Sequence, residues 1–129
     1  MTDAFSHIYK NGGIDKDSFY PYKAKRGTCK YDKNYVGATV SKIYEIPEND
    51  EATLKYAVEK YGPVAAAINV KNSFQHYKSG IYYEPACNPK ILNHAVLVVG
   101  YGTENGKDYW LAKNSFGKSV SEIDRFLSV

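Results

Sequence analysis

Cysteine, tryptophan and methionine are scarce in this sequence. Its 129 residues include two cysteines, one tryptophan and one methionine. Two cysteines cannot form the dense disulfide framework of a small secreted scaffold, so stability must come from a hydrophobic core. A chain of this length can bury roughly two-thirds of its unfolded surface, which is sufficient for one domain.

Long apolar runs and concentrated charge are also missing. No stretch approaches the ~18 apolar residues of a membrane span, and no signal peptide opens the chain. The net charge is +3, and the longest basic cluster is Lys23–Arg26. We therefore expect neither nucleic acid nor a membrane as a partner. With 43% hydrophobic and 24% charged residues, the composition is that of a folded globular protein.

The first third of the chain predicts little regular structure. Residues 1–10 can form a short helix that buries Phe5 and Ile8 and ends at the glycines 12–13. Residues 14–37 are irregular, and the apolar residues between 40 and 46 indicate a strand. The order helix, then strand, continues in the remainder of the chain.

The clearest helix signal covers residues 51–61. Leu54, Ala57, Val58 and Tyr61 recur at helical spacing, residue 49 or 50 can cap the start, and Gly62-Pro63 ends it. A strand of small residues at 64–68 and two helical turns at 73–79 follow. Apolar runs at 91–101 and 108–114 flank Asn105-Gly106, a strong hairpin signal. The whole predicts an α+β protein with mostly antiparallel strands.

Three histidines and the two cysteines are the candidates for chemistry. His7 and His76 have polar neighbours, and we expect both at the surface. They share no metal-ligand spacing with Cys29 or Cys87, so we expect no metal. The two cysteines can pair with each other, be free thiols, or pair with cysteines outside this chain.

His94 differs because it lies in an apolar run, where an imidazole needs a hydrogen-bond partner. The hairpin brings His94 and Asn114 nearly opposite each other, within reach of a cross-strand contact. Asn114 can then fix the tautomer and leave the second ring nitrogen to serve a nucleophile. A structural histidine beside a turn asparagine explains the same spacing.

Two sequence blocks decide between these interpretations, and they are residues 93–102, NHAVLVVGYG, and residues 108–117, DYWLAKNSFG. They resemble the histidine and asparagine blocks of papain-family cysteine peptidases, most closely the cathepsin L, K and S branch. The resemblance extends from residue 1 to about 117. It implies the papain-like fold, mainly its right-hand antiparallel β-barrel-like domain with short helices, incomplete here. Residues 1–20 would be a remnant of the left domain, 21–117 the right domain, and 118–129 a divergent tail.

The resemblance also implies roles for single residues. His94 would pair with the nucleophilic cysteine and later protonate the leaving amine, and Asn114 would orient it. Phe116 replaces the tryptophan that shields this hydrogen bond in the family. The substrate-binding positions would be Met1, Ala67, Leu92, Asn93 and Ala95. Ordinary core packing explains most of these residues equally well. They imply a hydrophobic substrate residue two positions before the cut.

The family's nucleophile block has no match in this chain. Cys29 and Cys87 instead resemble disulfide cysteines whose partners lie outside it. Without a thiolate there is no acyl-enzyme, so we expect the isolated chain to be inactive. The family implies peptide or protein substrates and no cofactor. It also implies a lysosomal or secreted protein. Its possible binding partners are the missing N-terminal segment, a propeptide and a cystatin-type inhibitor.

Two other functions remain open. The chain can be a non-catalytic remnant that binds peptides or a protease. It can also belong to a structural homologue such as the silicateins of sponges, in which serine replaces the nucleophilic cysteine.

Overall fold

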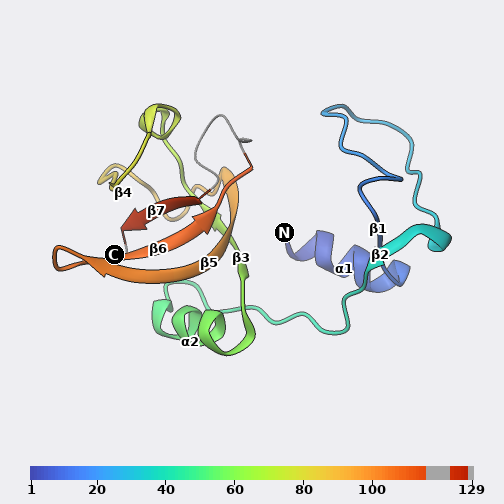
Figure 1. Cartoon of the computed structure of the whole chain (residues 1–129), viewed down its shortest axis with the longest axis horizontal. Helices are drawn as coiled ribbons and strands as arrows, with labels where there is room; N and C mark the ends of the chain where they lie inside the picture. The colour runs from blue at the N-terminus through green and yellow to red at the C-terminus, as the bar shows by residue number, and fades with distance from the viewer. Residues whose placement is uncertain (116–122, 128–129) are drawn as a thin grey trace. The chain divides into compact units, whose positions relative to one another are not determined.

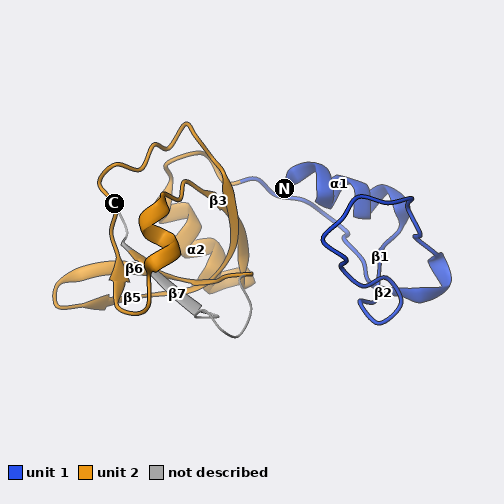
Figure 2. Cartoon of the chain, turned by 90° about the horizontal axis from the view of Figure 1, so that it is seen from above, with its two compact units in different colours: residues 1–45 blue, residues 46–129 orange. Residues whose placement is uncertain are grey.

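A computed structural model describes residues 1–115 and 123–127. The chain divides into two compact units, residues 1–45 and residues 46–129 (Figure 2). Within the described ranges, no helix is long and apolar enough to cross a membrane.

The first unit is built around one helix and a two-stranded sheet. Its elements are α1 (Thr2–Asn11), β1 (Ile14–Asp15), the 3-10 helix η1 (Lys33–Tyr35) and β2 (Val36–Ala38). Helix α1 ends at Gly12, whose φ of 80° is left-handed and favours glycine. Gly13 is required for a different reason, because a Cβ at residue 13 would lie 2.5 Å from Val36 Cγ1.

The second unit contains the longer elements. They are α2 (Glu51–Tyr61), β3 (Val64–Ile68), the 3-10 helix η2 (Asn72–His76), β4 (Ile81–Tyr82), β5 (His94–Glu104), β6 (Lys107–Lys113) and β7 (Ile123–Leu127). The sheet order is β3-β5-β6-β7-β4, and every pairing is antiparallel except β4 with β7 (Figure 1). The predicted α+β class is therefore confirmed.

Helix α2 packs on the β3–β5 part of the sheet (Figure 1). The buried cluster at this contact contains Val58 from α2, Val98 from β5 and Trp110 from β6. Asp50 caps the helix, because its Oδ1 accepts the Thr53 backbone N–H at 2.9 Å. This core anchors β5 and β6, the two strands that border the candidate site.

The hairpin between β5 and β6 forms as predicted. Asn105 and Gly106 have φ values of 53° and 73°, so both adopt the left-handed conformation of a tight two-residue turn. Gly102 faces Tyr109 across the hairpin, and a Cβ at this glycine would lie 2.6 Å from the Tyr109 hydroxyl oxygen. The glycine thus lets the tyrosine ring cover the strand.

Three local predictions are wrong. Residues 40–46 form no strand, because no described strand pairs with them, and Tyr44 is 82% exposed. Tyr61, at the end of α2, is 78% exposed and packs edge-on against Tyr56 instead of entering the core. On α1, Phe5 is exposed, and only Ile8 of the predicted pair is partly buried.

Candidate active site

His94 and Asn114 meet at one end of the β5–β6 hairpin. His94 is the first residue of β5 and pairs with Ile68 on β3. Asn114 directly follows β6. The His94 Nε2 and Asn114 Oδ1 atoms are 2.9 Å apart, which is hydrogen-bond distance. The structure thus brings together the two residues that the sequence selected as a pair.

A β-bulge on β5 makes this contact possible. Gly100 pairs with Leu111 but Val98 pairs with Ala112, so one extra residue, Val99, lies between them. Continuing this register by one residue places Asn114 across from Val96, on the same face as His94. In a regular ladder Asn114 would lie across from residue 97, whose side chain is on the opposite face. The bulge therefore brings Asn114 to the same face of the sheet as His94, where the two side chains make a diagonal cross-strand contact.

The hydrogen bonds at Asn114 identify the tautomer of His94. The Ser115 backbone N–H donates to the same Asn114 Oδ1 at 2.8 Å. This atom is thus the amide oxygen, an acceptor, and the proton in its bond to His94 belongs to Nε2. In the neutral ring the proton-accepting nitrogen is then Nδ1. An imidazole held in this way can take a proton from an acidic group and return it.

The site is largely screened from water. Asn114 is 8% exposed and His94 is partly buried. The ring of Phe74, which is 3% exposed, lies 6.1 Å from the His94 ring and also contacts Tyr82 and Phe126. The sequence motifs did not indicate Phe74, although a single aromatic residue in a short polar helix was the available signal. Low exposure strengthens the polar contact, because few waters compete for it.

Asn93, immediately before His94, is engaged with the backbone of residue 70. Its Oδ1 accepts the Val70 N–H at 2.8 Å, and its Nδ2 donates to the Val70 carbonyl at 2.9 Å. Its own backbone N–H donates to the Ile68 carbonyl at 3.1 Å. These contacts extend the β3–β5 ladder beyond the end of β3 and hold the backbone on which His94 begins.

The residues predicted to line a substrate pocket are solvent-accessible. Ala67 and Ala95 are exposed register partners on β3 and β5, and Leu92 is 57% exposed. Met1 is 47% exposed and belongs to the first unit. Ala67 and Ala95 thus form a small apolar surface, on the face of the sheet opposite the buried Val96.

The other chemical candidates are the two cysteines and the two remaining histidines. Cys29 and Cys87 are exposed free thiols, and His7 and His76 are exposed as predicted. Cys87 Sγ donates to the Asn69 carbonyl, and partial burial followed by the Glu84 carboxylate raises the pKa of its thiol. Phe116, the predicted shielding residue, lies outside the described residues. The described part of the chain holds no cluster of acidic, histidine and cysteine residues suited to a metal.

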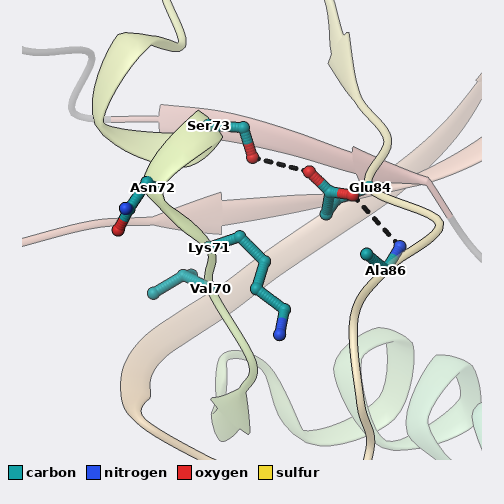
Figure 3. Close-up of a pocket in the computed structure, with 6 residues that line it drawn as sticks. All are labelled: Val70, Lys71, Asn72, Ser73, Glu84 and Ala86. Atoms are coloured by element: carbon teal, nitrogen blue, oxygen red, sulfur yellow. Dashed lines mark hydrogen bonds between the residues drawn. The ribbon is translucent and has the colours of Figure 1, made fainter.

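A shallow hollow of about 470 Å³ lies beside the loop that precedes His94 (Figure 3). Glu84 lines this hollow. The Ser73 hydroxyl donates to its Oε2 at 2.7 Å, and the Ala86 N–H donates to its Oε1 at 3.0 Å. The Ser73 hydrogen bond, together with the Ala86 N–H, lowers the pKa of Glu84. The carboxylate is thereby used to attach the loop to η2.

The chain is similar over most of its length to known cysteine proteinases and cathepsins. The chain is 49% identical over 120 residues to digestive cysteine proteinase 2 of Homarus americanus and 51% identical over 118 residues to cathepsin S of Bos taurus. These alignments cover 92% and 91% of the chain but only 37% and 35% of the relatives, so the chain spans little more than a third of their length.

Solved structures and family models lead to the same group. The digestive procathepsin L2 of Tenebrio molitor larval midgut superposes with a TM-score of 0.92 at 42% identity, covering 97% of this chain and 40% of that chain. The model of the papain family cysteine proteases matches residues 1–126. With the His94–Asn114 pair in place, this chain belongs to the papain family of cysteine proteases.

Proposed function

We propose that this chain supplies the general base and its orienting partner to a papain-type thiol endopeptidase. The observation that carries the proposal is the hydrogen bond from His94 Nε2–H to Asn114 Oδ1. It orients the ring and leaves Nδ1 as the basic nitrogen, which is the arrangement that a thiol nucleophile requires.

In the proposed reaction, Nδ1 of His94 takes the proton of a cysteine thiol that these 129 residues do not contain. The thiolate attacks the substrate carbonyl carbon, a C–S bond forms, and the C–N bond breaks as Nδ1–H protonates the departing amine. Water then hydrolyses the thioester with the same nitrogen as base. Asn114 keeps the ring oriented through both steps, because the Nε2–H is present in the neutral and in the protonated ring.

Neither cysteine of the chain suits the nucleophile's role. A nucleophilic thiol needs a lowered pKa, whereas that of Cys87 is raised and its Sγ is bonded to a backbone carbonyl. Cys29 belongs to the first unit, in an irregular exposed segment. We therefore expect the isolated chain to be inactive.

The substrate preference is part of the same proposal. Ala67, Ala95 and Leu92 offer small and aliphatic surface beside His94, which favours a hydrophobic side chain two residues before the cut. The family resemblance implies a lysosomal or secreted compartment and, as partners, a propeptide or a cystatin-type inhibitor. Digestive proteinases and a procathepsin among the similar proteins support synthesis with a propeptide.

Three measurements test the proposal. The pure chain is incubated with fluorogenic peptides that carry phenylalanine or leucine two residues before the cut. It should show no turnover sensitive to a thiol-directed epoxide inhibitor. The transcript should encode an in-frame cysteine nucleophile upstream of Met1. In that complete protein, His94→Ala should lower turnover by on the order of 10²–10⁴-fold, while His76→Ala, at an exposed histidine, should not. Inhibitor-sensitive turnover by the pure chain, or full activity of the His94 variant, would contradict it.

A further inference from the structure

The loop that leads into His94 contains no buried residue. Residues 83–93 are exposed throughout, apart from the partly buried Glu84. Side-chain packing therefore cannot hold this segment, and its conformation depends on hydrogen bonds. Glu84 attaches its beginning to η2, Asn93 attaches its end to Val70, and a third residue attaches the turn between them.

That residue is Asn69, which directly follows β3. Its Nδ2 donates to the Ile91 carbonyl at 2.6 Å, and its Oδ1 accepts the Asn88 N–H at 3.0 Å. Asn88 and Ile91 are themselves joined, because the Ile91 N–H donates to the Asn88 carbonyl at 3.0 Å. A single amide side chain thus holds both ends of the 88–91 turn.

The path from this turn to the catalytic ring is short. Ile91 is three residues before His94, and the intervening Asn93 bonds through its N–H to the Ile68 carbonyl. Ile68 is the register partner of His94 and the covalent neighbour of Asn69. Asn69 therefore connects the end of β3 to the exposed segment that directly precedes β5.

We propose that Asn69 is a positioning residue that holds the 88–91 turn against β3 and thereby keeps the His94 ring in line with Asn114. Its biological meaning rests on the proposed function, but the effect concerns the orientation of His94 and is measurable in the chain itself. The two hydrogen bonds of the Asn69 amide go to backbone groups of Ile91 and Asn88. Asn69 acts through the backbone of Ile91 to His94.

The test is NMR spectroscopy of the ¹⁵N-labelled chain with Asn69→Ala, Asn69→Asp and the control Asn72→Ala, an exposed asparagine on η2. In Asn69→Ala we expect the His94 and Asn93 amides to exchange with solvent about tenfold faster or more, because two hydrogen bonds are lost. The protected His94 Nε2–H signal should weaken in parallel. The Trp110 indole N–H, bonded to Glu51, should stay unchanged and report an intact core.

Asn69→Asp keeps the acceptor for Asn88 but sets a carboxylate oxygen against the Ile91 carbonyl oxygen. These two acceptors repel each other, so the exchange rates should again rise above those of the wild-type chain. Unchanged His94 and Asn93 signals in Asn69→Ala would overturn the proposal. If that variant loses the Trp110 signal, Asn69→Asp decides in the same way: altered His94 signals support the proposal and unaltered ones overturn it. Absence of peptidase activity in the complete protein would contradict the proposed function and leave these outcomes as they stand.

Discussion

Removal of the Glu51 carboxylate tests how the strand that leads to Asn114 is anchored. Trp110 lies on β6, is 9% exposed, and donates its Nε1–H to Glu51 Oε1 on α2 at 3.0 Å. An indole nitrogen can only donate, so Glu51→Ala leaves this buried N–H without its acceptor. Asn114 directly follows β6, four residues after Trp110, so loosening Trp110 weakens the strand that holds the candidate site.

The magnitude follows from the type of bond. A hydrogen bond to a charged group contributes about 1.5–3 kcal/mol to stability, and an unsatisfied buried donor costs a similar amount. We expect Glu51→Ala to lower the free energy of unfolding by about 2 kcal/mol. For a chain of this size that corresponds to a fall in Tm of roughly 6–10 °C. Glu51→Gln keeps a side-chain oxygen and should lose about 1 kcal/mol, mainly the charge assistance and its favourable place in the first turn of α2.

Thermal and urea unfolding measure these differences, with far-UV circular dichroism as the common probe. Trp110 is the single tryptophan, so its fluorescence reports the same site in the variants that retain it. A double-mutant cycle with Trp110→Phe should give a coupling energy of about 1–2 kcal/mol. A Glu51→Ala protein with unchanged Tm, or a coupling energy near zero, would refute the reasoning.

Two further predictions concern ionisable groups. The Asp50 pKa lies below its ordinary value of 3.8, because the Thr53 hydroxyl and then its backbone N–H donate to the carboxylate. The contribution of Asp50 to the free energy of unfolding should thus be complete above its unfolded pKa and be lost as pH falls through its folded pKa. The free energies of unfolding of wild type and Asp50→Ala should therefore converge at low pH. Glu84→Gln removes a charge that raises the Cys87 pKa, so alkylation of Cys87 should accelerate at neutral pH. Mass spectrometry measures this rate, with Cys29 as the reference in the same sample, and an unchanged rate ratio would contradict the assignment.

Local signals predicted the elements that depend on neighbouring residues. Asn105-Gly106 specified the hairpin because both residues accept the left-handed conformation that its turn needs. Asp50 and the spacing of apolar residues specified α2, since capping and periodicity act within a few residues. The apolar residues between 40 and 46 misled for the opposite reason: a strand needs a partner, which a local pattern cannot supply.

The pairing of His94 with Asn114 shows where sequence determination ended. Residue types, the hairpin and the family blocks were enough to select both residues. Only the tertiary structure showed that Val99 forms a bulge, because a one-residue change of register depends on how β3 and the core hold β5. The same is true of Asn69, whose two bonds reach backbone groups about twenty residues away. The sequence by itself determined which groups carry the chemistry, and long-range pairing decided which face they occupy and what holds them there.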